Sequence, residues 1–176
     1  MSGHNKFSKI RHQKAANDSK KSKIFGKLVR FITVEAKKAG GNLKSPGLAL
    51  AIEKAKKENM PNDTVERAVK KATTDNSAQM EHIQYECYGP GGIAILIEVL
   101  TDNRNKAAQE IKAILVRHSS ELASPGSASW AFTKTAEGIK ANITMPLEDE
   151  DIEKLHALVE ALEENDEVQG VFTNAE

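Results

Sequence analysis

The sequence predicts an α+β protein: an N-terminal three-helix domain followed by a ferredoxin-like α+β domain. Apolar residues recur with a helical period through the first half, whereas the second half combines short strand-like apolar runs with two amphipathic helices. Charge changes sign at the same place: residues 1–80 contain 18 lysines and arginines and 7 acidic residues, and residues 81–176 contain 7 and 18. Such segregation indicates two units, of which the first suits a polyanion. We expect a basic arm at 1–17, the helical domain at 18–72, a linker at 73–80 and the acidic domain at 81–176.

Composition restricts the environment of the chain. The single cysteine, Cys87, excludes an intramolecular disulfide and suits a reducing compartment, where we expect it as a half-buried strand residue. No apolar run approaches the roughly 18 residues of a membrane span, and the N-terminus has no secretory apolar region. A mitochondrial transit peptide is the alternative for this basic N-terminus. We favour a cytoplasmic protein because the segment is rich in lysine and its helical pattern continues into domain sequence.

The basic arm and the first helix form the most positively charged stretch. Residues 3–17 have no apolar period, only Phe7 and Ile10 as isolated anchors, so we expect an extended arm. A helix is predicted from Asp18 to Ala39, with Asp18 or Ser19 as N-cap and Gly40-Gly41 as its end. Its apolar face consists of Ile24, Phe25, Leu28, Val29, Ile32 and Ala36, and its opposite, basic face of Lys20, Lys23, Lys27, Arg30, Lys37 and Lys38.

Two apolar residues of this helix, Phe31 and Val34, fall on its basic side. Contact with a neighbouring helix is the favoured explanation. The alternative is a Phe31 ring available to stack on a nucleobase.

Two shorter helices complete the first domain. A loop at Asn42–Gly47 precedes a helix at 48–58, with Leu48, Ile52 and Ala55 inward and Lys54, Lys56 and Lys57 outward. Asn59-Met60-Pro61 breaks it. The capping-box spacing of Asp63-Thr64-Val65-Glu66 then predicts a third helix, with Asp63 as N-cap, to about Ala72.

In the second half, strands are expected at 84–88, 93–100, 129–133, 139–145 and 168–172. The run at 93–100 is apolar enough for a central strand. One helix is predicted after the cap Thr101-Asp102-Asn103, with Ala107, Ile111, Ile114 and Leu115 inward, and another at 148–164. Gly89-Pro90-Gly91-Gly92 is expected to form a tight strand-entry turn, with a close backbone approach to a partner as the alternative. It lacks the Lys-Ser/Thr of a phosphate-binding P-loop.

Three spaced blocks resemble the YebC/PmpR family, which includes the mitochondrial translational activator of cytochrome oxidase. The blocks are Gly3-His4, Ile10, Lys14-Ala15-Ala16, Asp18 and Phe25-x-Lys27-Leu28-x-Arg30; Ala51-Ile52-Glu53-Lys54-Ala55-Lys56 with Asn59-Met60-Pro61-x-Asp63 and Glu66-Arg67-Ala68; and Tyr88-Gly89-Pro90-Gly91-Gly92 with Leu100-Thr101-Asp102-Asn103-Arg104-Asn105. Leu147–Asn174 is similar to the family's C-terminal segment.

The chain also departs from the family pattern. Phe7 replaces a usual tryptophan, and Ser119-Ser120-Glu121-Leu122-Ala123 replaces a Gly-rich stretch. Little remains of the usual third domain, only about residues 134–146. The resemblance implies a non-enzymatic regulator of gene expression, either a DNA-binding transcriptional regulator or a ribosome-associated translational activator or stall-relief factor.

The basic segments suit a nucleic-acid backbone, because lysine and arginine neutralise phosphates and release counterions. We expect nucleic-acid contacts from Lys6, Lys9, Arg11, His12, Lys14, Lys20, Lys23, Lys27, Arg30, Lys37 and Lys38, with secondary contacts from Lys54, Lys56, Lys57 and Arg104. No base-reading motif is present, so backbone and shape recognition is expected, of DNA or ribosomal RNA. A solvated basic face, or an adaptor that binds an acidic protein, is the alternative.

Other chemistry is weakly indicated. The run Glu148-Asp149-Glu150-Asp151 is better explained as charge that complements a helix N-terminus than as a metal site. The five histidines have no metal-ligand spacing, and no nucleophile–base signature is present. We expect no metal, no cofactor, no small-molecule substrate, no membrane partner and no enzymatic activity.

Overall fold

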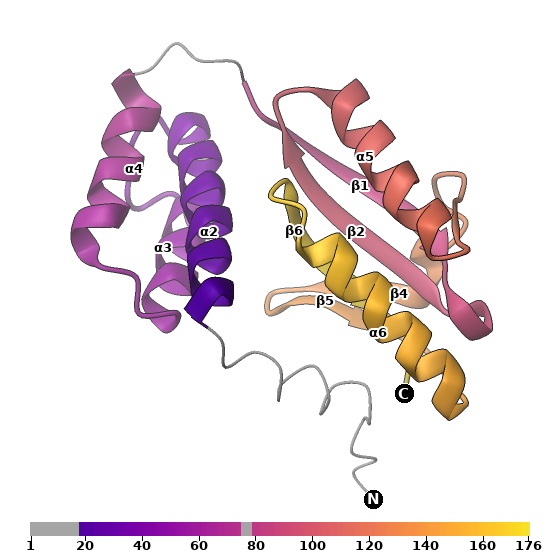
Figure 1. Cartoon of the computed structure of the whole chain (residues 1–176). Helices are drawn as coiled ribbons and strands as arrows, with labels where there is room; N and C mark the ends of the chain where they lie inside the picture. Colours follow the sequence, from indigo (N-terminus) through magenta and orange to yellow (C-terminus); the bar gives the residue numbers. More distant parts are fainter. Residues whose placement is uncertain (1–17, 75–78) are drawn as a thin grey trace, which may run out of the picture. The chain divides into compact units, whose positions relative to one another are not determined.

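The computed structural model describes residues 18–74 and 79–176 (Figure 1). The expected basic arm and residues 75–78 lie outside the described residues. The chain divides into two compact units whose boundary falls between Glu81 and His82. The first, called here the helical unit, consists of α2 (Asp18–Lys38), α3 (Pro46–Lys57) and α4 (Asn62–Thr74).

The helical unit has a core of its own. Helix α2 packs on both α4 and α3, with Ile32 and Ala36 fully buried between them. Its partners are mostly small, which lets the helix axes approach closely: Leu48, Ala51, Ala55, Met60, Val65, Ala68 and Ala72. Phe25, Leu28 and Val29 pack against this cluster, as their helical positions predict. Ile24, also expected there, is half-buried but lies outside the cluster.

Three helices end in the same hydrogen-bonded motif. After α2, Gly40 N–H donates to Lys37 O and Gly41 N–H to Ala36 O, and Gly40 has φ +56°. This is a Schellman motif, in which one left-handed residue satisfies the last carbonyls of the helix. Asn59 occupies the left-handed position after α3, and Ser119 does so after a later helix. The predicted Gly40-Gly41 end is therefore confirmed.

Helix starts differ from the sequence expectations by one or two residues. Helix α3 begins at Pro46, whose fixed φ and missing N–H suit the first helical position. Helix α4 begins at Asn62, and Pro61 O accepts the N–H groups of Thr64 and Val65. The expected N-cap role of Asp63 is therefore wrong, and this residue lies inside the first turn instead.

The second unit consists of His82–Glu176, and its elements are those that follow α4 along the chain. In chain order these are β1 (Glu81–Tyr88), η1 (Pro90–Gly92), β2 (Ala94–Thr101), α5 (Arg104–Arg117), β3 (Glu121–Leu122), η2 (Ser129–Ala131), β4 (Phe132–Thr135), β5 (Gly138–Ala141), α6 (Asp149–Glu163) and β6 (Val168–Thr173). Four strands form one sheet in the order β3-β1-β2-β6, and β4-β5 form a separate hairpin. Strands β3 and β6 are antiparallel to β1 and β2 respectively.

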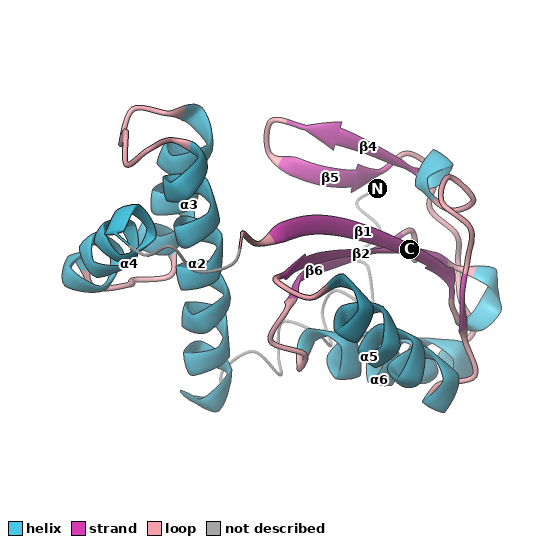
Figure 2. Ribbon diagram, turned by 90° about the horizontal axis from the view of Figure 1, so that it is seen from above, coloured by secondary structure: helices cyan, strands magenta, loops and turns pink. Residues whose placement is uncertain are grey.

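Strand β2 is covered on both faces, and this makes it apolar throughout. Ile95, Ile97 and Val99 face the cluster built by α5 and α6, whereas Ala94 and Leu96 belong to a cluster with η2, β4 and β5. Figure 2 shows the two helices on one side of the sheet and the hairpin on the other. Paired helices against a mainly antiparallel sheet confirm the α+β, ferredoxin-like class, and the central position expected for this strand is correct.

The Gly-Pro-Gly-Gly segment is a tight strand-entry turn, as predicted. Gly89 N–H donates to Ile93 O over 2.8 Å, which closes the connection between β1 and β2. Gly91 has φ +68°, and a Cβ there would lie 2.3 Å from Leu147 Cδ2. A side chain at this position would therefore clash with the residues that lead into α6.

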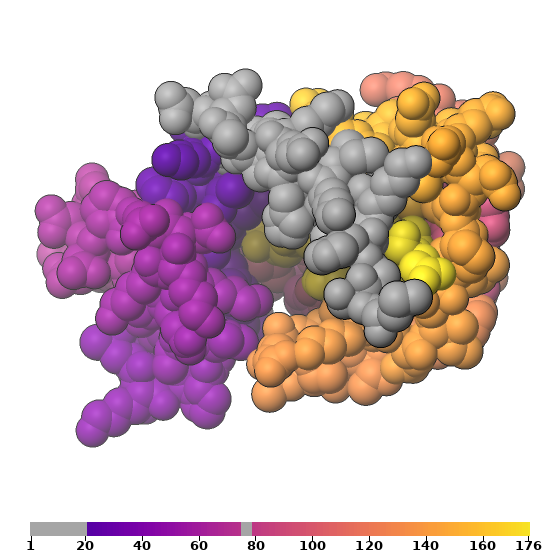
Figure 3. Space-filling view, turned by 90° about the horizontal axis from the view of Figure 1, so that it is seen from below, coloured from indigo at the N-terminus to yellow at the C-terminus, as the bar shows by residue number. Residues whose placement is uncertain are grey.

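Two expectations for the later strands were wrong, and one short strand was not predicted. Ser129–Ala131 form a 3₁₀ turn rather than a strand, because the Glu86 carboxylate accepts the N–H of Ala128 and Ser129. The strand expected to reach Met145 ends at Ala141. Met145 instead forms an isolated parallel β-bridge with Ala175, near the C-terminus. Figure 3 shows the C-terminal residues in yellow, beside the surface of the segments coloured orange. The two-residue strand β3 is too short to carry a periodic signal.

Candidate nucleic-acid interface

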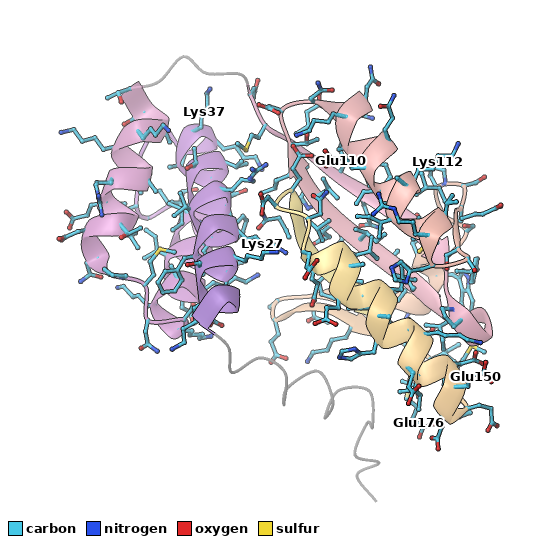
Figure 4. All side chains as sticks on the ribbon, in the orientation of Figure 1. Lys27, Lys37, Glu110, Lys112, Glu150 and Glu176 are labelled. Atoms are coloured by element: carbon cyan, nitrogen blue, oxygen red, sulfur yellow. The ribbon has the colours of Figure 1, made fainter. Side chains whose placement is uncertain are left out.

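The outward face of α2 carries the basic side chains that the helical period predicts. Lys23 and Lys38 are exposed, and Lys27, Arg30 and Lys37 are half-buried. Figure 4 shows Lys27 projecting from α2 on the side away from α4, and Lys37 near the C-terminal end of the helix. These residues recur at steps of three, four and seven, so their charges form a stripe along the helix axis. We call Lys23, Lys27, Arg30 and Lys37 the α2 stripe.

Two apolar residues on the basic side of α2, Phe31 and Val34, have different surroundings. The Phe31 ring packs against the core cluster of the helical unit, and Lys54 Nζ lies 5.4 Å from its centroid. Contact with a neighbouring helix is therefore confirmed for Phe31. A ring packed on one side and covered by an ammonium group offers a poor surface for base stacking. Val34 is 6% exposed but lies outside the core cluster, so one buried apolar residue lies among the basic residues on this side of the helix.

The expected secondary contacts on α3 are exposed, and two of them have partners within the helical unit. Lys54 is held over the Phe31 ring, and Lys57 Nζ forms an ion pair of 3.0 Å with Glu53. Lys56 is exposed on the same helix. On α2, Lys38 Nζ forms an ion pair of 2.9 Å with Glu35. A lysine with such a partner contributes less net positive charge to a passing polyanion than its sequence position suggests.

Several predicted contacts are not placed by the structure. Lys6, Lys9, Arg11, His12 and Lys14 lie outside the described residues. Lys20 belongs to α2, but its side chain is likewise not described. Arg104 is the first residue of α5 in the second unit, where it is exposed. It does not lie on the helix that carries the α2 stripe.

Helix α4 presents basic residues that the sequence reasoning missed. Arg67, Lys70 and Lys71 are all exposed, opposite the buried Val65 and Ala68. The Arg67 side chain is held by a hydrogen bond in which its Nε donates to Asp63 O over 3.2 Å. The signal was available, because a helix that buries positions 65, 68 and 72 must present 67, 70 and 71 on its outer side.

The second unit differs from the helical unit in its acidic charge and in containing the single cysteine. Burial raises the pKa of the fully buried Cys87 thiol to about 12, so it is uncharged at neutral pH and more deeply buried than expected. The acidic run after Leu147 occupies the start of α6, where Glu150 forms an ion pair of 2.6 Å with Lys154. This agrees with charges that complement a helix N-terminus.

Within residues 18–74 and 79–176, no group of three or more His, Cys, Asp or Glu side chains is placed to hold a metal ion. None of the helices in the described part of the chain combines the length and apolar character needed to cross a membrane.

Comparison with known proteins identifies relatives along most of the chain. A model described as the TACO1/YebC protein N-terminal domain matches residues 5–75, and one described as the TACO1/YebC second and third domain matches residues 80–139. The second match ends within β5.

Curated relatives carry the name "Probable transcriptional regulatory protein". The protein from Petrotoga mobilis is 44% identical over 184 residues, covering 100% of this chain and 71% of its own length. That from Fervidobacterium nodosum is 46% identical, covering 96% and 68%. That from Thermotoga petrophila is 47% identical, covering 76% and 54%. The matches therefore span 54–71% of the length of these three relatives.

A solved structure supports the fold. The crystal structure of a conserved hypothetical protein from Aquifex aeolicus is similar with a TM-score of 0.79 and 28% identity, covering 90% of this chain and 91% of that one. Two consecutive family models, high identity to the curated relatives and this structural similarity agree with the sequence blocks. The chain belongs to the TACO1/YebC family.

Proposed function

We propose that this protein is a non-enzymatic, DNA-binding transcriptional regulator of the YebC/PmpR type that grips the phosphate backbone through its helical unit. The observation that carries the proposal is the α2 stripe, which lies on the opposite side of the helix from a well-packed core. The names of the curated relatives support the regulatory role. A cytoplasmic location fits this role.

The physical basis of binding is the release of counterions. Each lysine or arginine that neutralises a phosphate frees a condensed cation, and affinity then falls steeply as salt rises. With about six such contacts, binding should weaken by roughly 10³ between 50 and 200 mM salt. Lysine predominates in the stripe and acts as a point charge without a fixed hydrogen-bonding geometry. Positioning on the backbone, rather than reading of base edges, is therefore the expected mode.

The same chemistry leaves RNA as the second candidate target. Recognition by backbone and shape suits a structured RNA, as on the ribosome, as well as a DNA duplex. The proposal of a non-catalytic role is supported by Cys87, whose raised pKa makes it unsuitable as a nucleophile. The acidic second unit would be repelled by a polyanion, so its proposed role is to contact protein or to orient the complex.

A matched pair of charge reversals tests the interface. The first variant changes Lys23, Lys27 and Arg30 to Glu, and the second changes Arg67, Lys70 and Lys71 to Glu. Each replaces two lysines and one arginine, so the change in net charge is identical. We expect the α2 variant to lose binding to a DNA duplex and most of its salt dependence, and the α4 variant to lose clearly less.

The measurement is fluorescence anisotropy of labelled duplex DNA, structured RNA and single-stranded DNA over a salt series. Ellipticity and the melting temperature show that each variant is folded, and Gln substitutions at the same positions replace any that is not. Equal affinity of the α2 variant and the wild type would refute the interface. Preference for the RNA would retain the interface but favour the ribosomal alternative, and binding only after an acidic protein is added would favour the adaptor.

A further inference from the structure

A buried carboxylate in the second unit holds a loop in place. Glu86, on β1, is 6% exposed, and its two oxygens accept the backbone N–H groups of Gly126, Ala128 and Ser129 over 2.7, 2.7 and 2.9 Å. Glu86 O also accepts Ala123 N–H over 2.8 Å. Four bonds from one residue thus fix the loop between β3 and η2.

Two exposed aromatic side chains lie beside this loop, Trp130 in η2 and Tyr88 at the end of β1. Trp130 is 54% exposed and Tyr88 is 39% exposed, although large rings are usually buried. Trp130 Nε1 donates to the Tyr88 hydroxyl over 3.2 Å, and that hydroxyl donates to Ser127 O. Asn142 Nδ2 donates to Trp130 O over 3.4 Å. The rings are therefore held on a rigid frame, but their surfaces remain open to solvent.

The hydrogen bonds determine what the aromatic pair can bind. The indole N–H already has an acceptor, and the phenol both donates and accepts within the frame. A ligand therefore meets ring faces rather than free donors. The face of an aromatic ring carries negative charge density and attracts cations, with tryptophan the strongest of the three rings.

The surroundings favour a cation as well. Glu121 is exposed and lies directly opposite Tyr88 in the ladder between β1 and β3. Of the two lysines on the neighbouring hairpin, Lys140 is bound by Glu137, and Lys134 is exposed. The whole segment 81–176 contains 18 acidic residues against 7 lysines and arginines, which would repel a nucleic acid and attract a basic protein.

We propose that Trp130, Tyr88 and Glu121 form a docking surface for an arginine-bearing segment of a protein partner. The guanidinium would lie on the indole face and pair with the Glu121 carboxylate, which a planar cation can do at the same time. Glu86 is the positioning residue, since it holds the loop but lies beneath it. This surface belongs to the second unit and does not depend on the proposed nucleic-acid interface.

The chain supplies its own reporter, because Trp130 is the single tryptophan of the sequence. The probe is a short peptide of alternating glycine and arginine, added to the full chain. We expect it to change the Trp130 emission in a saturable way. The same peptide with neutral citrulline in place of arginine should leave the emission unchanged, because the planar shape is retained but the cation is removed.

Variants assign the contacts, with binding of a labelled peptide followed by anisotropy. Trp130→Ala should weaken binding about five- to tenfold, the range expected for removing a partly desolvated cation–π contact. Trp130→Phe should lose less. Glu121→Gln should weaken binding severalfold, whereas Glu153→Gln, an equal charge change on exposed α6, should not. Glu86→Gln should weaken binding and increase quenching of Trp130 by iodide, which separates loosening of the loop from loss of charge.

Three results would overturn the proposal: no saturable change in Trp130 emission with the arginine peptide, an equal change with the citrulline peptide, or an equal loss in Glu121→Gln and Glu153→Gln. A dT oligonucleotide tests the competing class. Quenching of Trp130 by the oligonucleotide that weakens in Lys134→Gln would assign the surface to nucleic acid instead. Under our proposal Lys134→Gln leaves peptide binding intact.

Discussion

The ammonium group of Lys54 on α3 lies 5.4 Å from the centroid of the Phe31 ring on α2. The contact joins two helices that follow each other in sequence but meet through a side of α2 that carries mostly positive charge. It explains how a large aromatic residue can occupy that side, since one side of the ring packs on the core cluster and a cation covers the other. It also gives one lysine of the set expected to contact nucleic acid a partner within the helical unit.

A double-mutant cycle measures this contact. Phe31→Leu and Lys54→Met should show a coupling energy of about 0.5–1 kcal/mol, the value of an exposed cation–π pair. Because the single tryptophan lies in the other unit, urea unfolding of the helical unit is followed by ellipticity. The matched cycle of Phe31→Leu with Lys57→Met should show no coupling, since Lys57 is paired with Glu53. Equal coupling in both cycles would contradict the assignment.

The lowered pKa of Glu86 predicts that the protein loses stability in acid. Burial raises the pKa of Glu86, but the N–H groups of Gly126, Ala128 and Ser129 together outweigh burial and lower the pKa below its ordinary 4.5. A lowered folded-state pKa stabilises the protein above the unfolded pKa, and that stability is lost as pH falls through the folded value. Trp130 fluorescence in urea should therefore show a decline below about pH 4.5.

Replacement of this carboxylate should reduce the loss of stability in acid. Glu86→Gln should lower the free energy of unfolding at neutral pH by about 1–3 kcal/mol, because an amide NH₂ would face backbone donors. Its pH dependence in the acid range should be shallower than that of the wild type. Glu137→Gln is the control: the pKa of Glu137 is also lowered, by Lys140, but its carboxylate is fully exposed. An unchanged unfolding midpoint in Glu86→Gln would refute the proposed role of Glu86 in holding the loop between β3 and η2.

Ser119 carries backbone strain that a substitution can relieve. It has φ +57° after α5, with Ser119 N–H bonded to Val116 O and Ser120 N–H to Leu115 O. Ser119→Gly should raise the free energy of unfolding by about 0.5–1 kcal/mol, because glycine adopts the left-handed conformation without a Cβ penalty. Asn59→Gly, at the same position after α3, should gain less because asparagine tolerates this region. A larger gain at Asn59 would count against this explanation.

Gly91 should be intolerant of any side chain. A Cβ at this residue would lie 2.3 Å from Leu147 Cδ2, and φ +68° adds backbone strain. Gly91→Ala should destabilise the second unit by about 1–3 kcal/mol, measured by Trp130 fluorescence in urea. Adding Leu147→Ala should recover part of that cost because the clash is removed. Gly92→Ala is the control: it has a similar φ, but no atom lies within 4 Å of its Cβ position. Additive effects of the Gly91 and Leu147 changes would refute the clash.

Much of the fold followed from local patterns. Helical periods placed α2 and α6 within a residue or two and the predicted cap placed the start of α5, because amphipathic helices are encoded over short windows. The run from Ile93 to Leu100 predicted a strand buried on both faces, and the reversal of charge near residue 80 indicated two units. The Asn103 cap was also correct, since its side chain accepts Lys106 N–H over 3.0 Å. The family blocks named the family to which the chain belongs.

The candidate interface was only partly predictable. The α2 stripe follows from helical angles, and the exposed Arg67, Lys70 and Lys71 could have been found in the same way. Which lysines carry a partner could not be predicted, because Lys54 meets Phe31 only when α3 packs on α2.

By itself, the sequence determined the helices and the central strand, since each depends on neighbours within a few turns. It also determined the family, through spaced blocks of residues, and the segregation of charge between its two halves. Tertiary structure alone decided that Glu86 would hold a loop some forty residues further along and thereby replace an expected strand with a 3₁₀ turn. Only that long-range contact leaves Trp130 exposed on a rigid frame. The backbone donors that a carboxylate binds are those that the folded chain brings close to it, and the periodicity of the sequence does not encode that proximity.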